Sequence, residues 1–205
     1  MATQSFTITT NDDFILTTVT ADPATTTNWI SNVRRIHSEV NPLIIGFAIE
    51  YCQSPEQLRE PVDTLQLCDG NACLVFQIRH AAVIPDSLRE FLNDPNNVFV
   101  GVRILPDCNK LFAYHGLRIG NRAMAFDLRS PFMARSEGQL RPGSWGYRRL
   151  VKEILGKDYA PPRGLLNSWD NEVLTYEQVK YACLDAFYCF EMGKVLAVGR
   201  LPVPA

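Results

Sequence analysis

The sequence lacks the features of a membrane or secreted protein. No apolar run reaches the roughly 18–20 residues that a membrane-spanning helix needs, and the first residues lack the basic patch and apolar stretch of a secretion signal. We therefore expect a soluble protein that does not contact the membrane, placed in the cytoplasm or alternatively in the nucleus.

The chain also lacks a strong charge of either sign. Its 20 Lys and Arg face 22 Asp and Glu, which gives a net charge of -2. A broad cationic surface that holds duplex phosphates is therefore excluded, and any binding of nucleic acid must be local.

Metal-binding cysteine and histidine patterns are absent as well. The six cysteines include no C-x-x-C pair, and the three histidines are scattered. This spacing excludes the usual zinc sites and predicts reduced thiols packed as small apolar groups.

The length and the apolar content predict one folded unit. The chain has 205 residues, of which 46% are hydrophobic, and this is enough for a large core. We expect a single domain over 1–205, with a strand and helix extension at 1–40, the main body at 41–197 and a loose tail at 198–205.

Strand-like and helical patterns alternate along the chain. Apolar or β-branched runs predict strands at 14–20, 43–50, 64–68, 72–78, 97–102 and 123–126. Helical spacing predicts helices at 29–36, 87–93, 107–114, 145–156 and 176–195. The turn Asp69-Gly70-Asn71 predicts an antiparallel hairpin. Together these patterns predict a mixed α/β fold with a central sheet covered by helices.

The last predicted helix has the clearest start signal. Thr175 and Gln178 form a capping-box pattern, and Leu174 with Val179 has the spacing of a hydrophobic staple.

Three carboxylates lie where charge is costly. Glu50 closes an apolar strand, Asp107 follows another strand after a short turn, and Asp185 lies on an apolar helix. Buried carboxylates need a charged partner. If these three converge, their oxygens are ligands of the kind that hard divalent cations prefer.

Seven segments then resemble the 3'-5' exonuclease domain of the Werner syndrome helicase family, in the same order. They are 46–50 (GFAIE), 65–78 (LQLCDGNACLVFQI), 99–111 (FVGVRILPDCNKL), 127–129 (DLR), 155–157 (LGK), 168–169 (SW) and 174–186 (LTYEQVKYACLDA). The match covers roughly residues 40–195 and is most similar to stand-alone plant members, which include the RISC-interacting clearing 3'-5' exoribonucleases.

The resemblance implies a ribonuclease H-like fold of the DnaQ type and a DEDDy two-metal site. By motif, Glu50, Asp107 and Asp185 would hold Mg²⁺ or Mn²⁺, and Tyr181 would orient the attacking water. One position departs from the family pattern, because Ala48 stands where the family has the aspartate that bridges both metals.

Ala48 weakens the implied site. Three carboxylates neutralise two divalent ions less completely than four, so the affinity for metal should fall. Substrate phosphate and water can supply some ligands when a 3' end is bound. Whether Ala48 is natural or engineered stays open at this point.

The implied activity is stepwise hydrolysis of single-stranded RNA, with DNA as a second substrate, from the 3' end to nucleoside 5'-monophosphates. Terminal bases can stack on aromatic side chains while a few cations hold the phosphates. The candidates are Phe47, Tyr51, Arg148, Arg149, Lys152 and Lys157.

The resemblance also implies a homo-oligomer such as a ring, and a protein of the silencing complex as partner. The alternative function is a catalytically dead module that binds RNA ends or a partner protein.

Simpler interpretations accompany these residues. Without the family, Glu50 and Asp107 would be solvated or capping residues at strand ends. Asp127 fits a structural role as partner of Arg129. The Arg148-Arg149 pair fits a solvated helix face.

Overall fold

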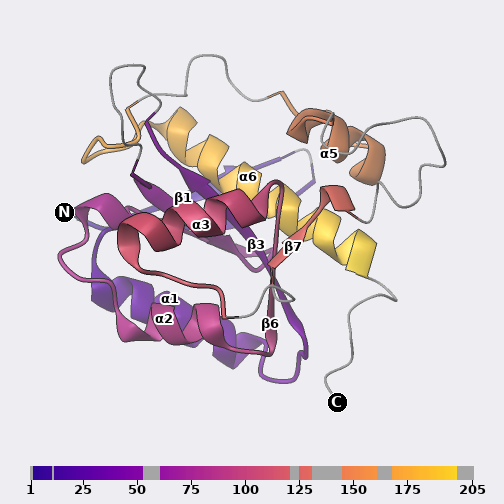
Figure 1. Ribbon diagram of the computed structural model, residues 1–205. Helices are drawn as coiled ribbons and strands as arrows, with labels where there is room; N and C mark the ends of the chain where they lie inside the picture. The colour runs from indigo at the N-terminus through magenta and orange to yellow at the C-terminus, as the bar shows by residue number, and fades with distance from the viewer. Residues whose placement is uncertain are drawn as a thin grey trace.

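The computed structural model describes residues 2–10, 12–52, 61–120, 125–130, 145–160 and 168–197. Seven strands of these ranges form one sheet in the order β1-β2-β5-β4-β3-β6-β7 (Figure 1). The strands are β1 (Gln4–Thr9), β2 (Phe14–Thr20), β3 (Leu43–Glu50), β4 (Thr64–Cys68), β5 (Ala72–Phe76), β6 (Asn97–Gly101) and β7 (Ala125–Asp127).

Helices cover both faces of this sheet. They are α1 (Pro23–Ile36), α2 (Asp86–Asn93), α3 (Ile104–His115), α5 (Tyr147–Leu155) and α6 (Tyr176–Ala197), with a short 3-10 turn at Ile78–His80. Figure 1 shows α1 and α2 on one side of the sheet, and α6 crossing the other side with α5 beside it. None of the helices in the described ranges combines the length and the apolar character needed to cross a membrane.

The strand pairings are mixed, as predicted. β3, β4 and β5 are antiparallel neighbours, whereas β3, β6 and β7 run parallel. The predicted hairpin at Asp69-Gly70-Asn71 is confirmed, because β4 pairs antiparallel with β5 across it. Parallel strands deliver their carboxyl ends to one edge of the sheet, so the residues that follow β3, β6 and β7 lie near one another.

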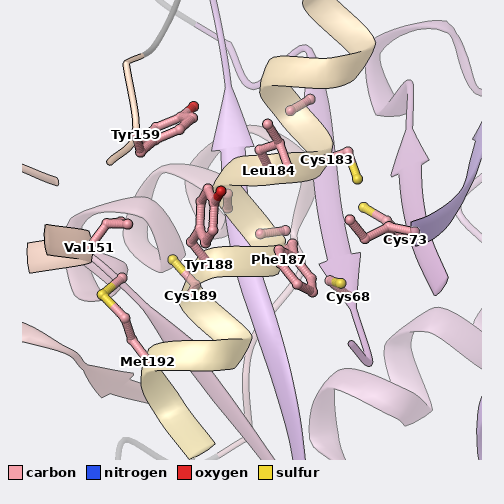
Figure 2. Packing of buried hydrophobic residues seen from close by; sticks show 14 of the residues in the cluster. Cys68, Cys73, Val151, Tyr159, Cys183, Leu184, Phe187, Tyr188, Cys189 and Met192 are labelled. Carbon is pink, nitrogen blue, oxygen red and sulfur yellow. The ribbon is translucent and has the colours of Figure 1, made fainter. Parts of the chain in front are cut away.

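Side chains of the central strands alternate between two cores. In β3, Ile45, Phe47 and Ile49 face the α1 and α2 side, whereas Ala48 belongs to the core under α6. Both faces are buried, as the continuous apolar runs predicted. Figure 2 shows part of the second core, where side chains of α6 meet those of β4 and β5.

The cysteines lie in these cores as free thiols. All six are unpaired, and Cys68, Cys73, Cys183 and Cys189 are buried. The four buried thiols pack as small apolar groups, as predicted, whereas Cys52 and Cys108 are half-buried.

The start of α6 also agrees with its sequence signal. The Thr175 N–H donates to Gln178 Oε1 over 2.9 Å, and the Gln178 N–H donates to Thr175 Oγ1 over 3.3 Å. Leu174 and Val179 are both buried. The capping box and the staple fix where α6 begins and the angle at which the chain enters it.

Some boundaries differ from the predictions. Strand β1 was not predicted as an element of the sheet, and it pairs antiparallel with β2, which in turn pairs parallel with β5. The strands of 1–40 are therefore part of the same sheet as those of 41–197. Helix α1 begins earlier than predicted, because Asp22 caps it and Pro23 occupies its first turn. Residues 123–124 and the predicted tail at 198–205 lie outside the described residues.

The closest approach of α6 to the sheet occurs at Gly46. A Cβ atom added there would overlap the carbonyl oxygen of Ala186 and lie 2.8 Å from the backbone nitrogen of Phe190. The α6 backbone thus rests directly on β3. A side chain at position 46 would push the helix away from the strand.

We therefore expect Gly46→Ala to lower the free energy of unfolding by about 3 kcal/mol, since overpacking against backbone cannot relax by a rotamer change. Chemical denaturation measures this value. Gly146→Ala is the matched control, because a Cβ at Gly146 meets nothing within 4 Å, and it should change the value by less than about 1 kcal/mol. Equal effects of the two variants would contradict this account of Gly46.

Candidate active site

The end of β3 and the second turn of α6 face each other. Glu50 and Ala48 are two residues apart on β3 and therefore share the face that α6 covers. Tyr181 and Asp185 are four residues apart on α6, one turn from each other on one face. The contact at Gly46 holds these two elements together, so the sequence-predicted residues of β3 and α6 meet.

Asp107 reaches the same place from a third element. It lies in the first turn of α3, which follows β6, and the N-cap Arg103 adopts a left-handed backbone with φ 62°. This turn reverses the chain directly after the strand. Because β6 runs parallel to β3, the start of α3 lies at the edge where β3 ends.

A cavity of about 780 Å³ opens between these elements. Its lining includes Ala48, Asp107, Tyr181 and Asp185, together with Arg103 and Arg129. Its size is that of a small-molecule or nucleotide site. Carboxylates from separate parts of the chain thus converge at a cavity at the carboxyl edge of the parallel strands.

The three carboxylates share one electrostatic environment. Burial, followed by the charges of Asp185 and Asp107, raises the pKa of Glu50 well above its usual range. Burial and the Asp185 charge raise the pKa of Asp107 to about 7, against the opposing effect of Arg103. Burial raises the pKa of Asp185 to about 6. Mutual repulsion of this kind is typical of a site that is built to meet a cation.

Tyr181 belongs to the same environment. Burial and the charges of Asp185 and Glu50 raise the pKa of its phenol far above the usual value, so the hydroxyl stays protonated. Its ring lies 5.9 Å from the Trp169 ring, centroid to centroid. A neutral phenol held by an aromatic neighbour can donate a hydrogen bond into the cavity.

Tyr147 of α5 anchors the helix beside Asp185. Its hydroxyl donates to the main-chain carbonyl of Asp185 over 2.6 Å. This contact fixes α5 to the turn of α6 that carries the carboxylate. The sequence analysis did not identify Tyr147, because nothing in the local pattern connects it with a residue 38 positions away.

The three carboxylates fit a divalent metal ion in part. The carboxylates supply hard oxygen ligands and shared negative charge, which suit a divalent cation. The described part of the chain nevertheless contains no group of three or more His, Cys, Asp or Glu side chains placed to hold one. Ala48, which is 5% exposed, occupies the position from which a fourth carboxylate would join them. The donor type fits, but a complete ligand cluster is absent.

The two aromatic residues predicted to stack bases differ in burial: Phe47 is buried and Tyr51 is half-buried. Phe47 is 1% exposed and packs edge-on against Phe99, with ring centroids 6.5 Å apart. A ring buried in the core cannot receive a base, so its position is at odds with the predicted role. Tyr51 is half-buried, with Lys110 Nζ 3.3 Å from its ring centroid.

The predicted cations lie on and after α5. Arg148, Arg149 and Lys152 are exposed, and the Arg149 guanidinium lies 4.0 Å from the Trp145 ring centroid. Lys152 Nζ contacts Asp158 at 2.8 Å.

Lys157 is half-buried and is bound to the hairpin of β1 and β2. Its Nζ contacts Asp13 Oδ2 at 2.7 Å. The pKa of Lys157 is raised by this hydrogen bond.

Asp127 pairs with Arg129, and this confirms its predicted structural role. Arg129 Nη2 lies 2.8 Å from Asp127 Oδ2, and Arg129 Nε donates to Asp127 Oδ1 over 3.1 Å. The pair places a guanidinium in the wall of the cavity, which sequence reasoning did not assign to it.

Solved structures show the class of the fold. The structure is similar to the Nibbler EXO domain of Aedes aegypti, with a TM-score of 0.71 and 15% identity over 94% of this chain and 91% of that one. It is also similar to Escherichia coli RNase D, with a TM-score of 0.69 and 20% identity over 88% of this chain and 44% of that one. The fold is therefore the ribonuclease H-like fold of RNase D-type exonuclease domains, as predicted.

Sequence comparisons show the family. A family model described as 3'-5' exonuclease matches residues 56–198. A 3'-5' exonuclease of Arabidopsis thaliana is 31% identical over 156 residues, which is 74% of this chain and 52% of that protein. The bifunctional 3'-5' exonuclease/ATP-dependent helicase WRN of Mus musculus is 27% identical over 148 residues, 70% of this chain and 10% of that protein.

The chain belongs to the 3'-5' exonuclease family. It spans about half the length of the Arabidopsis relative and a smaller share of the mouse protein. The family match begins at residue 56 and so does not include Ala48 and Glu50.

The raised carboxyl pKa values predict how stability changes with pH. Asp107 holds its proton more tightly in the folded chain than in the unfolded chain, so the folded state binds more protons between about pH 4 and pH 7. The free energy of unfolding therefore falls as the pH rises through this window, by at most about 1.4 kcal/mol per pH unit for each group.

Asp107→Asn removes this charge and keeps the shape of the side chain. We expect its stability relative to the unmodified chain to increase by about 1–3 kcal/mol from pH 4.5 to pH 7.5, measured by urea denaturation without divalent ions. Asp158→Asn is the control, because this side chain is 82% exposed and Lys152 lowers its pKa. If the stability of Asp107→Asn relative to the unmodified chain falls as the pH rises, the assignment of the raised pKa to Asp107 is wrong.

Proposed function

We propose that this chain is a metal-dependent exonuclease that removes nucleotides from the 3' end of single-stranded RNA and releases nucleoside 5'-monophosphates. The observation that carries the proposal is the cavity lined by Asp107, Asp185 and Tyr181, in a chain of the 3'-5' exonuclease family. Glu50 lies close enough for the charges of Asp185 and Asp107 to raise its pKa. We infer that the phosphodiester bond of the substrate is hydrolysed beside these carboxylates.

The carboxylates would hold Mg²⁺ or Mn²⁺. Divalent ions on carboxylates of this kind lower the pKa of a bound water and stabilise a leaving oxygen. The chain's own residues perform the remaining tasks. Tyr181 presents a protonated hydroxyl that can orient water, and Arg129 contributes positive charge beside the phosphate.

A single strand suits the site better than a duplex. The net charge of -2 gives no support to a long cationic track, and among the described residues the cavity is lined by two arginines, Arg103 and Arg129. One terminal nucleotide fits a cavity of about 780 Å³. The proposal includes a preference for RNA over DNA. The structural similarity to Escherichia coli RNase D, which is described as an exoribonuclease, supports this preference.

A role in a cytoplasmic small-RNA pathway, with a silencing-complex partner and a homo-oligomeric ring, completes the proposal. It follows from the resemblance to the plant exoribonucleases. Light scattering of the purified chain tests the ring, which requires a defined mass above that of one copy.

One observation favours a second candidate function. Ala48 and the incomplete ligand cluster support a module that binds RNA ends without hydrolysing them. This candidate shares the cavity and the substrate with the first one, and it differs only in turnover.

The direct test compares the unmodified chain with Ala48→Asp. Incubation of 5'-labelled single-stranded RNA with Mn²⁺ or Mg²⁺ should give a ladder that shortens from the 3' end. We expect Ala48→Asp to increase the rate at least about tenfold, because the fourth carboxylate completes the ligand set. The same assay with DNA measures the preference for RNA, and Asp185→Asn controls for contaminating nuclease.

Metal affinity gives a second readout that does not depend on turnover. Ala48→Asp adds a buried negative charge beside two carboxylates, so its melting temperature should fall without metal and recover when Mn²⁺ is added. Titration calorimetry should show tighter binding of Mn²⁺ to Ala48→Asp. RNA binding without shortening by the unmodified chain would favour the second candidate, and no shortening by either chain would refute the exonuclease.

A further inference from the structure

A buried phenol beside the carboxylates lacks a hydrogen-bond partner. Tyr159 is 6% exposed, and its hydroxyl oxygen is buried without a partner in the described part of the chain. Buried hydroxyl groups are nearly always paired, because an unpaired one loses its bonds to water. This exception therefore requires an explanation.

Tyr159 lies where two cavities meet. It lines the cavity of about 780 Å³ with Asp107 and Asp185. It also lines a neighbouring cavity of about 790 Å³ that includes Thr9, Lys157 and Lys180. Tyr181 is the other phenol that lines both. Tyr159 thus forms part of the boundary between the carboxylate cavity and its neighbour.

The hydroxyl lies close to the groups proposed to act on the substrate. After burial, the charge of Asp185 and the neighbouring Tyr181 phenol contribute most to raising the pKa of Tyr159, followed by Glu50. The phenol is therefore neutral and remains a hydrogen-bond donor.

The segment that carries Tyr159 is fixed at several points. Helix α5 ends at Gly156, whose N–H donates to the Lys152 carbonyl over 2.9 Å. Lys157 is bound to Asp13. The Tyr159 ring packs edge-on against Tyr147 and Tyr188, at centroid distances of 5.6 and 5.2 Å. Figure 2 shows the Tyr159 ring near Tyr188, which projects from α6.

We infer that Tyr159 is a substrate-binding residue whose hydroxyl donates a hydrogen bond to a non-bridging oxygen of the last phosphodiester of the strand. This inference rests on the proposed function and goes beyond it by adding a contact. A donor that is already buried and held in place gains a partner when the strand enters. The loss of its hydration was incurred during folding, so the new bond contributes to binding.

The phosphate oxygen is the acceptor that this environment requires. The neighbouring carboxylates repel a phosphate, and a neutral donor among them offsets part of that repulsion. A hydrogen bond to a charged acceptor is also stronger than one to a sugar hydroxyl. Tyr147 provides the contrast, because its hydroxyl is used within the fold on the Asp185 carbonyl.

The experiment measures binding of short 5'-labelled single-stranded RNA by fluorescence anisotropy, in EDTA so that no turnover occurs. Tyr159→Phe keeps the ring and removes the hydroxyl. We expect it to weaken binding about tenfold, the effect of losing a bond to a charged acceptor. Its melting temperature should stay equal or rise, because an unpaired buried hydroxyl is removed.

Two variants serve as controls. Tyr147→Phe should lower the melting temperature, since its hydroxyl bonds to the main chain. Tyr188→Phe removes a phenol from the same ring stack that lines only the neighbouring cavity, and it should bind RNA as the unmodified chain does.

An RNA with a methylphosphonate at its last linkage identifies the acceptor. The unmodified chain should bind one stereoisomer about tenfold more weakly than normal RNA, and Tyr159→Phe should bind both RNAs alike. Equal binding of normal RNA by the unmodified chain and Tyr159→Phe would overturn the inference and leave the proposed function intact. The inference would also be overturned if the methylphosphonate weakened binding to Tyr159→Phe as much as it weakens binding to the unmodified chain. Failure of the unmodified chain to bind RNA in EDTA would overturn the inference, whereas the proposed function is tested separately by the shortening of RNA with Mn²⁺ or Mg²⁺.

Discussion

The site depends on one contact, the direct packing of the α6 backbone on β3 at Gly46. Main chain touches main chain there, because a Cβ at this position would overlap the Ala186 carbonyl. A second close contact, between Gly193 and Val100 of β6, keeps the helix close along its length. With α6 held at this distance, Asp185 and Tyr181 face the end of β3. Neither the carboxylate environment nor the cavity would exist with the helix one side chain further away.

The charges that the packing brings together oppose folding. Burial raises the pKa values of Glu50, Asp107 and Asp185, and repulsion from neighbouring carboxylates adds to this effect at Glu50 and Asp107. The ionised forms are therefore disfavoured. Two apolar cores, one on each face of the sheet, offset this cost. Ala48 limits it further, since a fourth carboxylate would add to the same repulsion. Under the proposed function, Ala48 would lower the affinity for metal and favour the stability of the metal-free chain.

Much of the fold could be predicted because its signals are local. Strand alternation, the Asp69-Gly70-Asn71 turn and the Thr175 capping box each depend on residues that are close in sequence. The edge strand β1 was missed because its alternating polar residues are also compatible with an exposed loop. The burial of Phe47 away from the carboxylates could have been predicted, because the alternation of side chains along a strand puts it on the face opposite Ala48 and Glu50. Tyr147 and Tyr159 could not be found, because their importance comes from contacts across the fold.

The ion pair between Lys157 and Asp13 connects the first hairpin of the chain to the segment that carries Tyr159. Both strands of this hairpin lie before residue 56, where the family match begins, yet the hairpin contributes to the wall of the neighbouring cavity. Thermodynamic linkage acts in both directions. Under the proposed function, a strand end that binds against this wall would also stabilise the contact between Lys157 and Asp13, and through it the first hairpin.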